Sequence, residues 1–413
     1  MSEVINVPDE WEIDSFKSLK IKLIDGDRGS NYPKDEDFFD QGHCIFLSAK
    51  NVTKNGFKFD QLQFINKEKD DKLRKGKLER NDIVLTTRGT VGNISYFNKS
   101  VKYNHIRINS GMIILRNENK TLVTDYLYKF LNSNIFDNQI GNTVFGSAQP
   151  QLTVKEIEKF FMFFPKEKKE QEKIAKILST LDTAIESTQK LIDKEKNIKK
   201  GLMSDLLQNG IDKNGKIRTP KTHKYKDSEL GPIPEEWEVD VVENHSKIIT
   251  GNKDTQDRLD DGVYPFYVRS QTVERINSYS FDGEAVLTAG DGVGVGKVFH
   301  HVNEKFDFHQ RVYCIHEFSM KLDSKFFFEY FKTYFIEQVN KYSAKGSVDS
   351  VRYDMIALMN IPMPNIDEQI KIAKILNIQD KKIEKEEENL AKLKELKKAL
   401  MSDLLSGKVR VKV

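Results

Sequence analysis

A glycine-rich run is the stretch of this chain that comes nearest to a known reactive motif. It reads Gly290-Asp291-Gly292-Val293-Gly294-Val295-Gly296-Lys297. A GxxxxGK[ST] phosphate loop would need Gly in place of Asp291 and Ser or Thr in place of Val298, and GxGxxG fails at Val295. We therefore expect a tight turn between two strands, whose backbone can approach a ligand closely.

Other residues with reactive side chains also lack a catalytic pattern. The sequence contains no HExxH, GxSxG or CxxC, and no Asn/Asp-Pro-Pro-aromatic motif of the adenine-methyltransferase kind. His300 and His301 are the only close histidine pair, and we interpret them as solvent-exposed imidazoles rather than metal ligands. Cys44 and Cys314 are too few for a disulfide scaffold or a four-thiolate zinc site, so we expect two small buried hydrophobes. The chain is expected to catalyse nothing and to bind no metal or cofactor itself.

Composition limits the class of protein further. Lys and Arg total 66 and Asp and Glu 63 in 413 residues, for a net charge of +3. That balance excludes binding of nucleic acid by bulk charge but leaves room for a local basic face. No apolar stretch approaches the ~20 residues that span a bilayer, and the start lacks a basic segment followed by an apolar run. A soluble cytoplasmic protein of two or three domains is expected.

The chain is an internal repeat. Residues 171–207 begin QEKIAKIL and end KKGLMSDLL, and residues 369–405 begin QIKIAKIL and end KKALMSDLL, with 20 identities in 37 positions. Weaker matches lie upstream and pair Pro8-x-x-Trp11-Glu12 with Pro234-x-x-Trp237-Glu238, Leu85-Thr86 with Leu287-Thr288, His105-x-Arg107 with His309-x-Arg311, and Gly146-Ser147 with Gly346-Ser347. The first half has 24 more residues between its Trp and its Leu-Thr pair. Each half is thus a divergent globular part followed by a similar charged segment.

The two matching segments predict long helices. Their apolar residues recur in steps of three and four, which is typical of a coiled-coil seam. The seam residues are Ile174, Leu178, Leu181, Ile185, Ile192, Leu202 and Leu206 in the first helix and Ile372, Leu376, Ile383, Leu390, Leu393, Leu400 and Leu404 in the second. A helix of ~40 residues is ~60 Å long. A single solvated helix and a homodimeric zipper stay open, but we favour intramolecular pairing because two matching seams can bury each other.

The globular parts read as mixed α/β with much β structure. Ile83–Leu85, Met112–Leu115 and Phe160–Phe164 are expected strands, and Tyr126–Leu131 and Phe326–Phe331 are expected buried helices. Trp11 and Trp237 are expected core anchors. We predict domain 1 at 1–165, a long helix at 166–209, a linker at 210–232, domain 2 at 233–364, a second long helix at 365–407 and a tail at 408–413.

This layout closely resembles the specificity subunit of type I restriction–modification systems. The resemblance covers essentially the whole chain, and its specific part is IAKIL, LMSDLL and Gly231-Pro232-Ile233-Pro234-Glu235-Glu236-Trp237. It implies two β-rich target-recognition domains, each reading one half of a bipartite asymmetric DNA site in the major groove. It also implies an antiparallel coiled coil that spaces them. The implied partners are double-stranded DNA, two methyltransferase subunits that supply S-adenosylmethionine and methylate adenine N6, and a motor–nuclease restriction subunit that uses ATP and Mg²⁺.

Base reading requires forked donors and amides on loops between strands. Segments that match between the halves supply the candidates: Lys50, Asn51, Lys54, Thr87, Arg88, His105, Arg107, Gln149 and Gln151 in half one, and Arg269, Gln271, Thr288, Asp291, His309, Arg311, Lys345, Ser347 and Arg352 in half two. Arg88, Arg107, Arg269 and Arg311 are candidate guanine readers, and Lys50, Lys54 and Lys345 candidate phosphate contacts. The His-x-Arg pair has a structural alternative because it occurs in both halves. Two other functions stay open: the recognition part of a fused methyltransferase–nuclease, and a coiled-coil scaffold without a DNA role.

Overall fold

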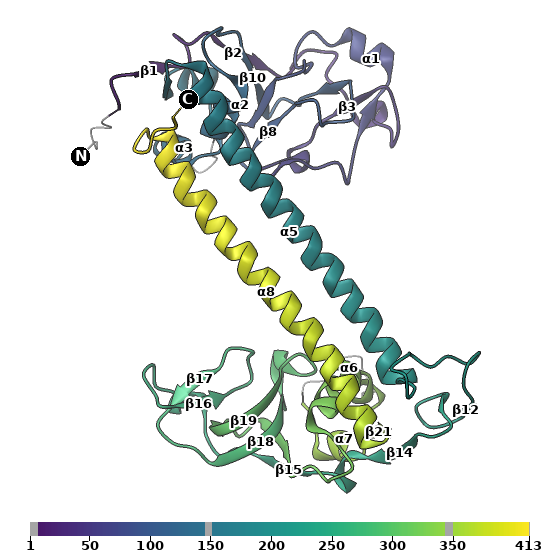
Figure 1. The fold of residues 1–413 in the computed structure, drawn as a ribbon. Helices are drawn as coiled ribbons and strands as arrows, with labels where there is room; N and C mark the ends of the chain where they lie inside the picture. The colour runs from purple at the N-terminus through teal and green to yellow at the C-terminus, as the bar shows by residue number, and fades with distance from the viewer. Residues whose placement is uncertain (1–6, 145–150, 343–349, 413) are drawn as a thin grey trace. The chain divides into compact units, whose positions relative to one another are not determined.

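The computed structural model describes residues 7–144, 151–342 and 350–412 and divides the chain into two compact units (Figure 1). Unit 1 comprises residues 1–189 and 389–413, and unit 2 comprises residues 190–388. Each unit contains one globular domain and parts of two long helices, α5 (Lys168–Asn209) and α8 (Ile366–Leu405). The mixed α/β fold and the internal repeat expected from the sequence are confirmed.

Domain 1 belongs to unit 1. Its strands are β1 (Trp11–Ser15), β2 (Ile21–Asp25), β3 (Cys44–Phe46), β4 (Val52–Thr53), β5 (Gly56–Phe57), β6 (Phe64–Ile65), β7 (Ile83–Thr86), β8 (Ile94–Tyr96), β9 (Ile106–Arg107), β10 (Met112–Asn117) and β11 (Phe161–Pro165). Its helices are α1 (Lys67–Lys72), α2 (Thr124–Leu131), α3 (Asn134–Val144) and α4 (Val154–Ile157), with 3-10 turns η1 (Asp35–Asp37) and η2 (Ala49–Asn51).

Domain 2 belongs to unit 2. Its strands are β12 (Tyr225–Lys226), β13 (Ile233–Pro234), β14 (Glu238–Val241), β15 (Lys247–Thr250), β16 (Tyr264–Tyr267), β17 (Glu274–Ile276), β18 (Phe281–Ala289), β19 (Phe299–Phe308), β20 (Val312–His316) and β21 (Asn360–Met363). The helices α6 (Ser324–Lys341) and α7 (Tyr353–Ala357) and the 3-10 turns η3 (Val242–Asn244), η4 (Thr255–Asp257) and η5 (Gly292–Gly294) complete it. The glycine-rich run forms the β18–β19 turn, as expected.

The two domains share one topology. Domain 1 has sheets of order β2-β10-β7-β8 and β6-β3-β9, and domain 2 joins the equivalent strands into the order β15-β20-β18-β19-β16-β17. A separate antiparallel pair, β1–β11 or β14–β21, leads into and out of each domain. Domain 1 alone inserts η2, β4 and β5 between β3 and β6, and α1 between β6 and β7. These insertions account for most of the 24 additional residues that the first half has between its Trp and its Leu-Thr pair.

Strand periodicity explains why the central strands have no polar face. Ile83 and Leu85 of β7 pack into the core that contains α2, whereas Val84 packs into a second core beneath β3 and β9. Successive side chains of a strand point to opposite faces, so a strand covered on both sides reads as a continuous apolar run. Trp11 and Trp237 are 5% and 1% exposed, which confirms them as core anchors.

A buried glutamine fixes the start of each long helix to its domain. Gln171 donates to the carbonyl oxygens of Thr121 (3.0 Å) and Pro165 (2.8 Å) and accepts from the Val123 N–H (2.7 Å). Gln369, its repeat partner, donates to Lys321 and Pro364 and accepts from Asp323 in the same way. The first residue of both repeated motifs is therefore a connector between helix and domain.

The long helices pair in opposite directions within each unit. In unit 1, Lys397 of α8 lies 2.5 Å from Asp182 of α5. In unit 2, Lys199 of α5 forms an ion pair with Asp380 of α8, at the repeat-equivalent positions. All fourteen predicted seam side chains are buried or half-buried, as a paired seam requires.

The segment expected to be a linker is attached to unit 2. Ile211 and Arg218 are buried, and Arg218 forms an ion pair with Glu368 at the start of α8. Arg410 in the tail makes the corresponding contacts in unit 1, at 2.7 Å from both Glu170 and Glu10. Among the described helices, none has a stretch apolar and long enough to cross a membrane.

Candidate nucleic-acid interface

Three loops of domain 2 meet around one carboxylate. Asp291 follows β18, Arg269 follows β16, and Arg311 lies in the turn between β19 and β20. Arg269 donates from Nη1 to Asp291 Oδ1 at 2.9 Å, and Arg311 Nε lies 3.7 Å from Asp291 Oδ2. Both guanidiniums stay about half exposed, at 46% and 65%. Since a guanidinium has five N–H donors, each keeps donors free for a second acceptor.

His309 supports the turn between β19 and β20 that carries Arg311. Its Nδ1 accepts the Arg311 backbone N–H at 2.9 Å, so a neutral ring carries its proton on Nε2, which lies 3.7 Å from Asp254 Oδ1. Burial, assisted by the charge of Arg269, lowers the pKa of His309. The ring is 2% exposed. His309 therefore acts as a positioning residue for Arg311, and its burial argues against the predicted direct contact with DNA.

Domain 1 presents Arg88 at the matching place. Arg88 follows β7 and forms a β-bridge with Gln151, just as Asp291 forms a β-bridge with Ser350. The turn before β10 lies beside it, because the Arg88 N–H donates to the Gly111 carbonyl at 3.3 Å. Arg88 and Gln151 are both exposed. The two domains thus bring equivalent loops together with different side chains.

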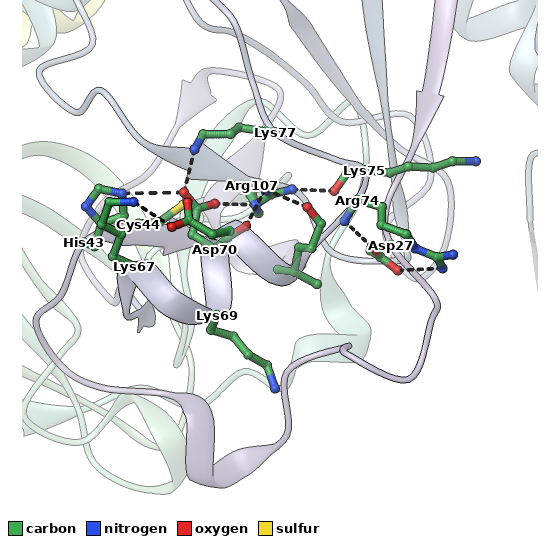
Figure 2. Close-up of polar contacts among 12 residues, drawn as sticks. Asp27, His43, Cys44, Lys67, Lys69, Asp70, Arg74, Lys75, Lys77 and Arg107 are labelled. Atoms are coloured by element: carbon green, nitrogen blue, oxygen red, sulfur yellow. Dashed lines mark hydrogen bonds and ion pairs between the residues drawn. The ribbon is translucent and has the colours of Figure 1, made fainter.

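Arg107, predicted to read guanine, is locked inside domain 1. Figure 2 shows Arg107, Lys77 and His43 converging on the fully buried carboxylate of Asp70. The Arg107 guanidinium also donates to the carbonyls of Asp70, Lys75 and Leu73 at 2.7, 2.7 and 3.1 Å. Its donors are used within the domain and it is 5% exposed, which argues against guanine reading by Arg107 and favours the structural alternative for the His-x-Arg pair in half one.

Electrostatics explain why Asp70 remains charged in the interior. Burial acts to raise the pKa of Asp70, but hydrogen bonds from Lys77 and Arg107 outweigh it and lower the pKa. The neighbouring Cys44 thiol has its pKa raised to about 12, mainly by burial and also by the charge of Asp70. Cys44 is therefore an unreactive core residue, as the sequence predicts.

Three more predicted contacts are buried within their domains. Asn51 hydrogen-bonds to Ser48, Lys58 and Gln61, and Thr87 pairs through its backbone with Gly111 and Leu152. Thr288, near the carboxyl end of β18, lies between β19 and β20 in the ladder. Their side chains are 1% to 3% exposed. This burial argues against the predicted DNA contacts of these three residues, because a buried side chain has no surface to offer a base.

The remaining predicted contacts divide into exposed residues and residues outside the described chain. Lys50, Gln271 and Arg352 are exposed, Lys54 lies 2.8 Å from Asp137, and the ring of His105 stacks on His43 at 4.3 Å. Gln149, Lys345 and Ser347 lie outside the described residues. For the exposed residues, DNA contact stays a prediction.

Two features of domain 1 escaped the sequence reasoning. One is a pair of exposed cations after α1, Arg74 and Lys75, which extend away from the Asp70 cluster (Figure 2), the Arg74 guanidinium lying 3.7 Å from Asp27; the basic run after α1 could have indicated them. The other is a groove of about 920 Å³ lined by Gln41, Gln61, Gln63 and Lys50. Its sequence signal is the extra length of the first half.

The histidine pair differs from its prediction. His300 and His301 are half-buried rather than solvent-exposed, and burial lowers the pKa of both. His301 Nε2 lies 3.1 Å from both Glu284 Oε1 and Ser324 Oγ. Across residues 7–144, 151–342 and 350–412, no three His, Cys, Asp or Glu side chains are grouped as a metal site would need.

Comparison with known proteins agrees with this architecture. The type I restriction modification DNA specificity domain matches twice, at residues 8–195 and 234–395. The chain is 27% identical to the type I restriction enzyme MjaVIII specificity subunit of Methanocaldococcus jannaschii, over 99% of this chain and 95% of that one. It is 26% identical to the EcoDI specificity subunit of Escherichia coli over 43% of this chain and 40% of that one.

Solved structures show the same fold. The specificity subunit of the type I restriction–modification system from M. genitalium superposes with a TM-score of 0.65 at 15% identity, covering 98% of both chains. A second solved chain, from work on assembly and conformational transition of a type I restriction–modification system, gives 0.55 at 13% identity, covering 98% of this chain and 100% of that one. With the family match covering both halves, the chain belongs to the specificity subunits of type I restriction–modification systems.

Proposed function

We propose that this chain recognises a bipartite, asymmetric DNA site, with one half read by each domain, and that it has no catalytic activity of its own. The observation that supports this is a shared topology with different side chains at matched loops. Arg88 and Gln151 stand where Asp291 and Ser350 stand in the other domain. A repeated scaffold with unlike reading loops gives an asymmetric site, whereas identical halves would give a palindrome.

The chemistry of the loops fits base reading. Arginine contacts guanine O6 and N7 through two parallel hydrogen bonds, and glutamine contacts adenine N6 and N7. Asp291 holds two guanidiniums at one loop cluster and leaves them half exposed. A guanidinium held in this way loses less conformational entropy on binding than a free surface arginine.

Partner subunits supply the reaction in this proposal. Two methyltransferase subunits would bind S-adenosylmethionine and methylate adenine N6, and a restriction subunit would use ATP and Mg²⁺. The paired helices α5 and α8 would hold the two recognition domains apart on the duplex and give the partners a repeated surface. The chain's part is recognition and assembly.

Co-expression with its methyltransferase subunit in a methylation-free host tests this directly. Modified adenines are then mapped across the host genome. One bipartite asymmetric motif is the expected result, and it would give both half-sites and the spacer. A stable complex that binds no duplex at 50 mM salt, where phosphate contacts are strongest, would contradict the proposal.

A further inference from the structure

The amide-lined groove of domain 1 is built from elements that domain 2 lacks. It lies along the segment between β5 and β6, and η2 forms one of its borders. In domain 2 a short loop, residues 268–273, replaces η2, β4 and β5 between the equivalent strands β16 and β17. Two domains that read different sequences must differ where they read, so this insertion is the place to look for the specificity of domain 1.

The groove presents three glutamine side chains without partners. Gln41, Gln61 and Gln63 are exposed, and none of their amides makes a hydrogen bond to any described residue. Gln61 and Gln63 both line the groove from the segment that precedes β6. Leu62 and Phe64 also line the groove, and they pack against the core that contains Ile45 of β3.

A buried asparagine holds the glutamine-bearing segment in place. Asn51 donates from Nδ2 to the carbonyls of Lys58 (3.0 Å) and Gln61 (2.8 Å), and its Oδ1 accepts from the N–H and the hydroxyl of Ser48. Phe59 packs on Tyr103 with ring centroids 5.0 Å apart. The amides therefore project from a fixed backbone, which base recognition requires.

The groove is connected to the loop that carries Arg88. Asn93, in the β7–β8 turn, donates from Nδ2 to the Val52 carbonyl of the β4–β5 hairpin at 2.9 Å. The charged residues of the groove favour base edges over phosphates. Asp40, Asp60 and Lys50 lie among its lining residues, and Lys58 lies 3.0 Å from Asp60. Two carboxylates beside one lysine attract a phosphate weakly, whereas an uncharged amide can pair with a base edge.

We propose that this groove reads adenine in the half-site of domain 1, through Gln61 and Gln63, with Asn51 as a positioning residue. The inference rests on the proposed function. A glutamine amide offers an acceptor to adenine N6–H and a donor to adenine N7 at once, which matches no other base edge in the major groove. A good bidentate contact discriminates by roughly 5- to 150-fold against the wrong base.

Selection from a pool of randomised duplexes tests the inference. The full chain is used in complex with its methyltransferase subunit, and bound duplexes are sequenced for the wild type and for Gln61→Ala, Gln63→Ala and Gln61→Glu. Each alanine variant is expected to lose adenine preference at one position of one half-site, with the other half-site unchanged. Gln61→Glu keeps the shape but loses the donor, so preference is expected to shift toward cytosine, whose N4 amino group donates to a carboxylate.

The controls separate failure of this inference from failure of the proposed function. Asn214→Ala removes an exposed amide from the segment between α5 and β12 and should select the wild-type motif. If the wild type selects a bipartite site and all three glutamine variants select the same site, the groove does not read DNA while the proposed function stands. A uniform loss of affinity without a change of motif would also overturn the inference. A wild type that selects no site would overturn both.

Discussion

At the scale of single residues, burial separates the arginines that hold domain 1 together from those that can contact a ligand. Arg107 satisfies its donors on Asp70 and three backbone carbonyls, whereas Arg88 is exposed at a loop. Both were equivalent candidates in the sequence, because spacing does not report which side chain turns inward. Asp70, whose carboxylate draws the Arg107 side chain into the interior, lies 37 residues before Arg107 in the sequence.

The Asp70 cluster gives a pH-dependent prediction. Asp70→Asn leaves Arg107 buried without its counter-charge, which should destabilise unit 1 by about 3 kcal/mol at neutral pH. The pKa of Asp70 is lowered in the folded chain. Its stabilisation is therefore complete above the unfolded pKa of about 3.9 and is lost as pH falls through the folded value. Denaturant unfolding at several pH values should show the difference between wild type and variant shrinking below about pH 4. A constant difference would contradict this account.

Exposed cations of domain 1 should separate into specific and general contacts. Arg88→Ala should cost about 1–3 kcal/mol of binding and relax one base position, because a guanidinium fork discriminates bases. Lys54→Ala should weaken binding to all sequences and flatten the salt dependence by about one unit of slope, as a lost phosphate contact does. Equilibrium binding to duplexes at several salt concentrations measures both. An unchanged motif in the Arg88 variant would remove its assignment.

At the scale of elements, the repeat could be predicted from the sequence because both long helices have the same apolar periodicity and begin with the same buried glutamine. Gln171 and Gln369 open both motifs and make equivalent hydrogen bonds. The strands were readable as apolar runs. The insertions η2, β4, β5 and α1 were visible only as extra length, since short polar segments carry no periodicity. The side chains they present could therefore not be assigned from the sequence.

The glutamine connectors predict matched losses of stability. Gln171→Ala removes three hydrogen bonds at a fully buried position. At about 1 kcal/mol per bond, the start of α5 should lose about 3 kcal/mol. Amide hydrogen exchange should show faster exchange there and unchanged exchange in domain 2. Gln369→Ala is the matched control and should affect only the start of α8; faster exchange throughout the chain in either variant would indicate a role beyond connection.

One polar contact distinguishes the two helices. Glu195 of α5 is 4% exposed and accepts from Gln379 at 2.7 Å and Lys382 at 2.7 Å on α8, which lowers its pKa. The repeat partners of these three residues are Leu393, Leu181 and Ala184. If α5 paired with a second α5, Glu195 would face Leu181 and Ala184 without a partner. The contact therefore favours pairing of α5 with α8, as single buried polar residues do in coiled coils.

Replacing this contact by its repeat partners should remove the preference. The triple variant Glu195→Leu, Gln379→Leu, Lys382→Ala should raise the melting temperature of unit 2, because Glu195 is a buried charge whose lysine partner is half exposed, and apolar residues often replace a buried charge with a gain in stability. It should also populate dimers that sedimentation velocity detects. Glu195→Leu alone, which removes the carboxylate acceptor of the half-buried Gln379 amide, should lower the melting temperature. A strictly monomeric triple variant would show that the contact does not select the partner.

At the scale of the whole molecule, the repeated elements and the divergent domains have separate roles. We call the helices α5 and α8, with the strand pairs and arginine contacts that attach them to the domains, the frame. The antiparallel pairs β1–β11 and β14–β21 lead into each domain, and the arginine clamps at Glu170 and Glu368 belong to the frame. A domain can therefore be exchanged within its strand pair without touching the frame. Grafting residues 16–160 in place of residues 242–359 gives a chain with domain 1 in both halves.

The grafted chain should recognise a symmetric site. In the proposed arrangement the antiparallel helices present the two domains to the duplex in opposite directions, so two copies of domain 1 should read the same half-site as an inverted repeat. Mapping of modified adenines with the co-expressed methyltransferase subunit measures this. The reciprocal graft, residues 242–359 in place of 16–160, should give a palindrome of the other half-site, and the two motifs together should reconstruct the wild-type site. An asymmetric motif from either graft would mean that residues of the frame, rather than the domains, read part of the sequence.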